Sequence, residues 1–230
     1  MEITWYGQAC VRMRGREGSI VAEAYPSIVG PTGRGITADI ATYSHPDPNP
    51  SPVRGGAKRT GAAVAEAPIV VVPTSLEPAF LLTGPGEYEV HDILVTGVRT
   101  ARDESRGSDR GLNTAFVYEL DGLHVVHLGD VGHLLNQDQL GEIGSVEVAC
   151  VPVGGSLSAA RVAEVVSQLD ASLVVPLPVA ESDDDSAAAM ARFFHEMGVT
   201  APAPQSKLTV TISSVPDETT VVLLEQRGRV

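Results

Sequence analysis

The order of strand-like and helix-like segments is the feature that most constrains the fold of this chain. In the first half, alternating or short apolar runs bounded by Gly or Pro predict strands at 2–6, 9–14, 19–25, 38–43, 68–73, 79–83 and 92–98. In the second half, strands predicted at 112–120, 123–128, 146–153, 173–176, 207–213 and 219–225 are interleaved with helices predicted at 137–143, 158–169 and 185–197. Strands first, then strands alternating with helices, favour an α/β domain of two sheets covered by helices.

Two segments interrupt this pattern. Residues 46–67 are rich in Pro, Gly and small side chains, which predicts a long exposed loop, and residues 101–111 are dense in charge and Gly. The dipeptide Asp121-Gly122 predicts a tight hairpin turn. Since 230 residues with 43% hydrophobic side chains suffice for one sizeable core, we expect a single domain over 1–230, with a long loop at about 46–67.

Composition excludes several classes of partner. The net charge is −13 and the chain has only two lysines, so we expect neither nucleic acid nor a membrane as a partner. No run approaches the roughly 18 apolar residues of a membrane span, and no secretory signal pattern opens the chain, so we expect a cytoplasmic protein. Cys10 and Cys150 read as reduced core residues, and without a CxxC pair a thiolate zinc site is excluded.

The stretch Tyr43-Ser44-His45-Pro46-Asp47-Pro48-Asn49 looks like a metal-binding loop that lacks most of its ligands. A two-metal hydrolase needs several imidazoles and carboxylates close together. This loop offers His45 and Asp47 alone.

Further landmarks occur in a recognisable order along the chain. They are Gly7-Gln8-Ala9-Cys10, Gly84-Pro85-Gly86-Glu87-Tyr88, Gly111-Leu112-Asn113-Thr114, His127-Leu128-Gly129-Asp130, Val151-Pro152-Val153-Gly154-Gly155 and Val175-Pro176-Leu177. Together with the His45 loop, this series resembles the metallo-β-lactamase superfamily, in the branch of small bacterial proteins regarded as metal-dependent hydrolases. The resemblance implies a four-layer αββα sandwich, in agreement with the strand and helix pattern.

The resemblance also implies metal ligands on loops at one edge of the sheets, and here that site is depleted. His45, Asp47 and Asp130 keep a metal-binding side chain. At the other matching positions Gln8 stands for a His, Glu23 for an Asp, and Pro48, Arg102 and Pro178 for ligand histidines. Proline supplies no side-chain donor and a glutamine is a poor ligand, so we expect no bound metal.

Arg102 suggests how the site would manage without metal. Crowded carboxylates at Glu23, Asp47 and Asp130 would repel one another, and a guanidinium would compensate part of their charge. We therefore hypothesise that Arg102 lies where a metal would otherwise lie. The alternative is that Arg102 belongs to a solvated charged loop.

Two histidines flank Asp130. We expect His127 to be a core residue or to support the site from behind, and His133 to be exposed or to cap a helix. The alternative for His133 is a new ligand set of His45, Asp130 and His133.

Three functions follow from these residues. The first is an inactive pseudo-enzyme with a binding or assembly role. The second is a hydrolase with a rearranged mononuclear site for zinc or another divalent metal, with Asp47 as its catalytic residue. The third is a small-molecule binding protein that uses Gln8, Arg102 and Asn113 in the old cleft. We allow for a homo-oligomer, and the small-molecule ligand is not identified by the sequence.

Overall fold

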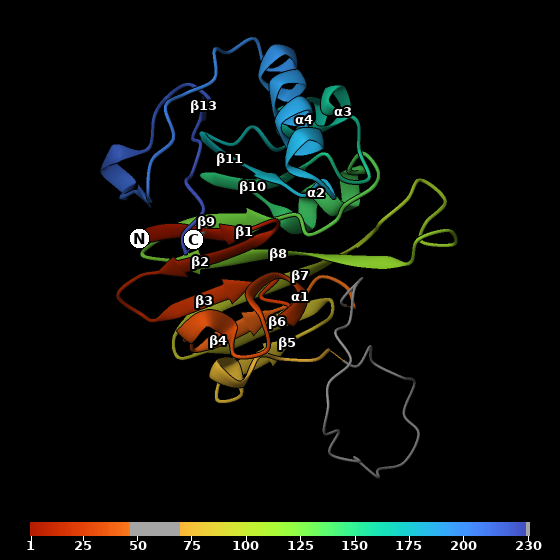
Figure 1. Cartoon of the computed structure of the whole chain (residues 1–230). Coiled ribbons are helices and arrows are strands. Elements are labelled where there is room, and N and C mark those ends of the chain that lie inside the picture. The colour runs from red at the N-terminus through yellow and green to blue at the C-terminus, as the bar shows by residue number, and fades with distance from the viewer. Residues whose placement is uncertain (47–69, 229–230) are drawn as a thin grey trace.

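The computed structural model describes residues 1–46 and 70–228, and its centre is a pair of packed β-sheets (Figure 1). The first sheet has the order β12-β1-β2-β3-β4-β5 and the second the order β13-β11-β10-β9-β8-β7-β6. The strands of the first sheet are β1 (Glu2–Gly7), β2 (Cys10–Arg14), β3 (Ser19–Ala22), β4 (Ile40–Thr42), β5 (Phe80–Leu82) and β12 (Leu208–Thr209). Those of the second are β6 (Gly86–Val90), β7 (Ile93–Ala101), β8 (Leu112–Leu120), β9 (Leu123–His127), β10 (Val148–Val153), β11 (Leu173–Pro178) and β13 (Thr220–Val221).

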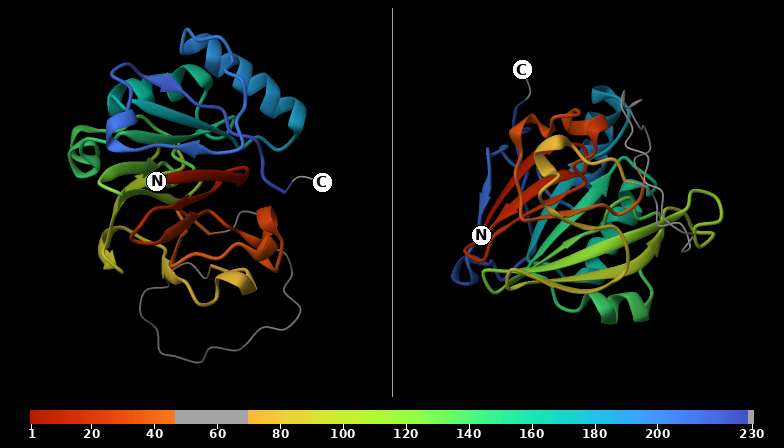
Figure 2. Two further views of the ribbon diagram at one scale, coloured as in Figure 1. Left: turned by 90° about the vertical axis from the view of Figure 1, so that its left-hand side faces the viewer. Right: turned by 90° about the horizontal axis from the view of Figure 1, so that it is seen from below.

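Helices cover the outer faces of both sheets, as the views in Figure 2 show. Helices α2 (Gln137–Ile143), α3 (Ala159–Leu169) and α4 (Asp183–Glu196) lie on the second sheet. Helix α1 (Pro26–Val29) and the 3₁₀ turns Gly33–Gly35 and Thr74–Leu76 lie on the first, and a third 3₁₀ turn spans Ile212–Ser214. The expected four-layer αββα sandwich is confirmed, although α1 makes its outer layer thin.

Three apolar clusters hold these layers together. Between the sheets, Ile3, Met13, Phe116 and Cys150 are buried in one cluster. Under the helices of the second sheet lies a second cluster, which includes Val162, Val165, Val166, Leu169 and Phe193. A third lies outside the first sheet and is built around Tyr25, Tyr43 and Leu76. Burial of apolar area of this extent is the main stabilising term of such a fold.

The hairpin prediction at Asp121-Gly122 is confirmed in its detail. Asp121 has φ +56° and Gly122 has φ +71°, so both central residues are left-handed, as a type I′ turn requires. The turn joins β8 and β9, which pair antiparallel with Leu120 opposite Leu123.

Several predicted strands are shorter than expected or absent. Residues 70–73 form no strand, and residues 68–69 lie outside the described part of the chain. The predicted strands 207–213 and 219–225 shrink to two residues each in β12 and β13. Strand β6 was missed because this edge strand is largely exposed and its alternating sequence contains two apolar side chains, Tyr88 and Val90, which are partly buried. No helix within residues 1–46 and 70–228 is long and apolar enough to cross a membrane.

Helix α4 begins with a side-chain cap that gives a first testable prediction. Ser182 Oγ accepts a hydrogen bond from the backbone N–H of Asp185 at 3.1 Å. Ser182→Ala should lower the free energy of unfolding by about 1 kcal/mol, because the cap partner is lost. Denaturant unfolding measures this change, and Ser182→Asp should keep most of the stability. The matched control is Ser186→Ala inside the helix, and an equal loss there would contradict the capping role.

Candidate functional site

The candidate site lies where strand ends of both sheets meet. Glu23 directly follows β3, and Ser44-His45 follow β4 by one residue. Arg102 follows β7, and Asp130 lies shortly after β9. The two sheets touch here, because the Thr114 N–H donates to the Ser44 carbonyl at 2.9 Å. Gly129 packs against Ser44 so closely that an added Cβ would lie 2.4 Å from the Ser44 Cβ.

Arg102 and Asp130 form an ion pair at the centre of this site. Arg102 Nε donates to Asp130 Oδ2 at 2.8 Å, and the two side chains are 17% and 16% exposed. Ser156 Oγ donates to Asp130 Oδ1 at 2.9 Å. Arg110 Nη2 lies 3.8 Å from Asp130 Oδ2 as a second, more exposed cation. The contact that the compensation hypothesis requires is therefore present, and Arg102 does not point into solvent.

Asn113 is committed to the backbone around this pair. Its Oδ1 accepts from the Asp130 N–H at 2.9 Å, and its Nδ2 donates to Thr100 Oγ1 and to the Leu128 carbonyl. The side chain is buried. The expectation that Asn113 would be a polar handle in the cleft is therefore wrong, because its hydrogen-bonding capacity is used within the protein.

Glu23 forms a second, fully buried cluster on the first sheet. Its Oε1 accepts from the Ser44 N–H at 2.6 Å, and its Oε2 accepts from Ser44 Oγ at 2.8 Å. His45 Nδ1 lies 2.7 Å from Ser44 Oγ and 3.7 Å from Glu23 Oε2. Burial raises the pKa of Glu23 from 4.5 to about 7, although the Ser44 hydrogen bonds oppose the shift. The Asp130 charge raises this pKa further, so the two clusters interact electrostatically.

His127 connects the two sheets and is not a ligand candidate. Its ring is buried, with Nδ1 accepting from the Gly129 N–H at 3.1 Å. Nε2 therefore carries the proton and donates to the Ala9 carbonyl at 2.9 Å. Burial lowers the pKa of His127 to about 4, so the ring is neutral. This geometry fits the expected core role.

His133 differs from its expected place. The ring is half-buried, and Nε2 accepts from the Ala101 N–H at 3.0 Å while Nδ1 donates to the Leu134 carbonyl at 2.7 Å. The prediction of an exposed or capping residue is wrong. The alternative ligand set with His45 and Asp130 is not formed either, because the backbone occupies both ring nitrogens of His133.

The remaining predicted positions lie around the same edge or outside the described residues. Gln8 is exposed in the turn between β1 and β2. Pro178 ends β11, opposite Val153. Gly155 lies between the residue that follows Pro178 and the Asp130 carboxylate. A Cβ on Gly155 would lie 3.0 Å from Val179 Cγ2 and 3.2 Å from Asp130 Oδ1. Asp47, Pro48 and the predicted loop at 46–67, apart from Pro46, lie outside the described residues.

Ser156 and Asp103 were missed as site residues. Ser156 follows the Gly154-Gly155 pair, where small residues after a buried strand signal a close approach of the backbone. Asp103 anchors the 101–111 loop, because its carboxylate accepts from the N–H groups of Gly107, Asp109 and Arg110. The sequence suggested that this loop is a solvated charged segment. The buried Asp103 carboxylate instead holds the loop in place beside Arg102.

Within the described residues, the side-chain donors do not form a metal centre of the expected kind. Zinc in proteins takes three or four nitrogen, sulfur or oxygen donors. Within residues 1–46 and 70–228, no group of three or more His, Cys, Asp or Glu side chains is placed to hold a metal ion. A guanidinium lies on the carboxylate that would be the central ligand.

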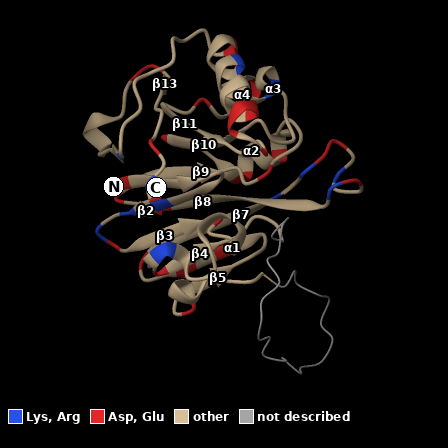
Figure 3. Cartoon of the chain, viewed as in Figure 1, with Lys and Arg blue, Asp and Glu red and all other residues tan. Residues whose placement is uncertain are grey.

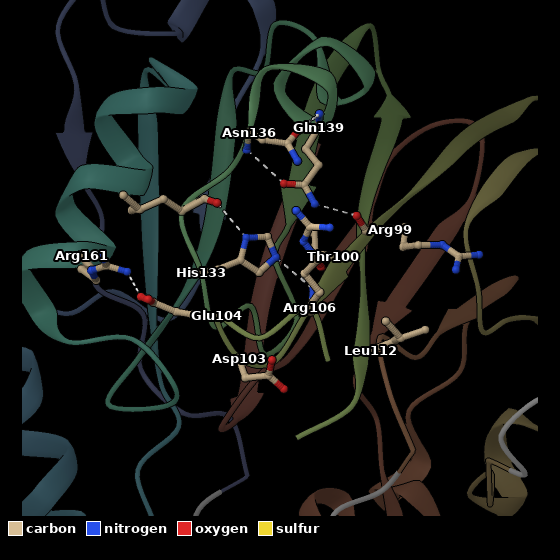
Figure 4. A pocket seen from close by; sticks show the side chains of 12 residues that line it. Arg99, Thr100, Asp103, Glu104, Arg106, Leu112, His133, Asn136, Gln139 and Arg161 are labelled. Carbon is tan, nitrogen blue, oxygen red and sulfur yellow. Dashed lines mark hydrogen bonds and ion pairs between the residues drawn. The ribbon is translucent and has the colours of Figure 1, made fainter. Parts of the chain in front are cut away.

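A cavity of about 580 Å³ lies beside the ion pair (Figure 4). Ala101 and Asp103 line it, while Arg102 between them turns to Asp130. The His133 side chain also lines the cavity, and Arg161 forms an ion pair with Glu104 at its rim. Gln139 Nε2 donates to the Arg99 carbonyl at 2.8 Å and joins α2 to β7. Several basic side chains therefore line the cavity, and its volume is suited to a small molecule.

Comparisons with known proteins agree with this architecture. A protein of Methanoregula boonei named metal-dependent hydrolase is 27% identical over 184 residues, which cover 77% of this chain and 81% of the relative. A protein of Listeria innocua with the same name is 24% identical over 207 residues, or 80% of this chain and 89% of the relative.

Solved structures show the same fold. The crystal structure of a Thermotoga maritima protein, described as a putative Zn-dependent hydrolase of the metallo-β-lactamase superfamily, has a TM-score of 0.70 and 25% identity. The match covers 97% of this chain and 98% of that one. A metallo hydrolase of Ignicoccus hospitalis matches with a TM-score of 0.59 and 13% identity, over 91% and 99% of the two chains, and so shows the fold alone.

The family comparison covers the strands that carry the site. The model of the β-lactamase superfamily domain matches residues 2–178, which include Glu23, Arg102 and Asp130 and end at Pro178. This chain therefore belongs to the β-lactamase superfamily, in its metallo-β-lactamase fold.

Proposed function

We propose that this chain is a non-catalytic member of the superfamily that uses the fold for binding or assembly. One contact carries the proposal: Arg102 Nε donates to Asp130 Oδ2 at 2.8 Å. A protein cation thus neutralises the carboxylate that the family resemblance assigns to the metals. No divalent metal could use that oxygen unless Arg102 moved away.

The neighbouring polar groups support the same proposal. Asp130 Oδ1 accepts from Ser156, and both Glu23 oxygens accept from Ser44. A metal would have to break these hydrogen bonds in a site where desolvated polar groups are costly to leave unpaired. The site is thus a closed polar network rather than an open coordination sphere.

The names of the relatives favour a second candidate function. The Methanoregula boonei and Listeria innocua proteins are named metal-dependent hydrolases. A rearranged mononuclear centre would use His45 and Asp130, with Asp47 as the catalytic residue. A catalytic zinc needs three protein ligands and an open position, so this candidate requires Arg102 to leave Asp130.

The cavity in Figure 4 favours a third candidate, which is small-molecule binding next to the old metal site. Its lining carries Arg99 and Arg106 beside Asp103 and the Arg161–Glu104 ion pair, so these two arginines could hold an anionic group of a ligand. A thermal shift screen of metabolites separates this candidate from the first. A ligand that stabilises the protein should lose its effect in Arg106→Gln and keep it in the control Arg192→Gln on α4.

Elemental analysis tests the main proposal. The purified full chain is incubated with zinc, manganese or iron, dialysed, and its metal content measured. We expect well under one metal ion per chain, because Arg102 holds Asp130. Retention of one zinc, iron or manganese per chain would overturn the proposal and support the hydrolase candidate. Arg102→Ala is the comparison variant, and a gain of metal there alone would place the block at the guanidinium.

A further inference from the structure

A second cavity, of about 530 Å³, lies away from the candidate site on the outer face of the first sheet. Ile3 and Met13 point into the core between the sheets, so the alternating residues Thr4 and Arg12 face outward. The cavity is built from both ends of the chain and is lined by Glu2, Thr4, Arg12, Arg14, Ser206, Lys207, Glu225, Gln226 and Arg227. Along β1, Glu2 lies roughly 20 Å from the Gln8 turn at the other strand end.

The lining is basic although the protein is strongly acidic. Four cationic side chains, Arg12, Arg14, Lys207 and Arg227, face two carboxylates, Glu2 and Glu225. The whole chain has a net charge of −13. Figure 3 shows basic positions along β2, in contrast to the acidic start of α4. Such a local reversal of sign concentrates anions at this place.

The carboxylates of the lining do not balance this positive charge. Lys207 Nζ pairs with Glu2 Oε2 at 2.6 Å. The hydrogen bond from Lys207 lowers the pKa of Glu2, and the charges of Arg14 and Arg227 lower it further. Within the described ranges, no carboxylate lies within 4.0 Å of a guanidinium nitrogen of Arg12, Arg14 or Arg227. These three guanidinium groups therefore exceed the one remaining carboxylate of the lining, Glu225, and leave positive charge for an external anion.

Arg12 supplies an independent sign of a missing partner. Its Nε is buried and has no hydrogen-bond partner in the described part of the chain. A buried charged donor without a partner costs free energy, and native proteins almost always satisfy such groups. The side chain lies opposite Thr4 in the β1–β2 ladder, so its position is set by rigid strands. Because Arg12 lines the cavity, an anion bound there would interact with its guanidinium group and offset the cost of this buried charge.

We propose that this cavity binds a small polyanion through the guanidinium of Arg12, supported by Arg14 and Arg227. The ligand carries phosphate or carboxylate groups, since a guanidinium fork matches the oxygens of either group. A volume of about 530 Å³ falls in the range of small-molecule sites. The site is separate from the Arg102–Asp130 pair and does not depend on the proposed function.

Calorimetric titration of the full chain with pyrophosphate and with citrate tests the proposal. We expect saturable binding of one equivalent of at least one probe, weakened by added salt. The tighter probe shows whether phosphate or carboxylate groups are preferred. Arg12→Gln should weaken binding at least tenfold, and ligand-induced thermal stabilisation should fall in parallel. If neither probe shows saturable binding, the proposal is overturned.

The control variant is Arg192→Gln, which removes the same charge from the exposed face of α4. It should bind as the unmodified chain does. Equal weakening in both variants would mean a general charge effect, and unchanged binding in Arg12→Gln would exclude the site; either result overturns the proposal. Arg227→Gln, in the C-terminal segment, provides a second test should Arg12→Gln fail to fold. It should also weaken binding, by less than Arg12→Gln, and unchanged binding in this variant counts against the site.

Discussion

Arg102→Ala is expected to lower the free energy of unfolding by about 2 to 3 kcal/mol, because it leaves the Asp130 carboxylate without its closest cation. The pair is mostly buried, with side chains 17% and 16% exposed, so solvent screens it only in part. Among the described residues, Ser156 would remain as the side-chain hydrogen-bond donor to Asp130. Urea unfolding of the variant and the unmodified chain measures the difference.

Two further variants make this measurement specific. Arg110→Ala removes a guanidinium that is 50% exposed and 3.8 Å from the same oxygen, so its effect should stay within about 0.5 kcal/mol. A double-mutant cycle of Arg102→Ala with Asp130→Asn should give a coupling energy of at least about 1 kcal/mol. Equal losses from the two arginines, or no coupling, would mean that Arg102 acts through packing of its stem and not through Asp130.

The fold was predictable from sequence where periodicity and turn chemistry agree. Strand 112–120 and helix 137–143 match β8 and α2 at both ends. The Asp121-Gly122 turn sets the register of β8 against β9. Strand β6 was missed because its alternation rests on two apolar residues, Tyr88 and Val90, which are partly buried against the core. The closing strands were overestimated because apolar alternation there marks contact with the core, while pairing extends over only two residues.

The site was predictable only in part. The family resemblance led to Arg102 and Asp130, and the ion pair between them joins residues that are 28 apart in sequence. The partners Ser156 and Asn113 could not be inferred in the same way, because their contacts arise from the packing of β8 and β10 around Asp130. The sequence suggested that the Asn113 side chain could bind a ligand. In the buried site its amide instead donates a hydrogen bond to the Leu128 carbonyl.

The change in the free energy of unfolding caused by Glu23→Gln is expected to reverse its sign with pH. The reason is that the native protein holds the Glu23 proton more tightly than the unfolded chain does. The pKa of Glu23 is about 7 in the fold against an ordinary value of 4.5. Between these values the native state binds more protons, so this group stabilises the fold at low pH and the stabilisation is lost as pH rises through 7. Relative to the unmodified protein, Glu23→Gln should gain about 3 kcal/mol between pH 4.5 and pH 8.

His127 hides this effect in the unmodified protein. Its pKa is lowered from 6.5 to about 4, so the unfolded chain binds the extra proton and stability falls as pH drops from 6.5 to 4. The two buried groups therefore act in opposite directions between pH 4.5 and 6.5, and the stability of the unmodified protein should change little there. In Glu23→Gln the His127 contribution remains alone, and stability should fall steeply on acidification.

Unfolding by urea at several pH values between 4.5 and 8 separates these contributions. The control is Glu87→Gln on the exposed strand β6, whose stability should run parallel to that of the unmodified chain. Parallel curves for Glu23→Gln would mean that Glu23 ionises normally and that the hydrogen bonds from Ser44 and Tyr25 compensate its burial. A stabilised variant at pH 8 would instead show that the protein keeps a costly carboxyl beside Ser44. A site that retains such a group against stability is under a constraint other than folding, which fits a binding role at these strand ends.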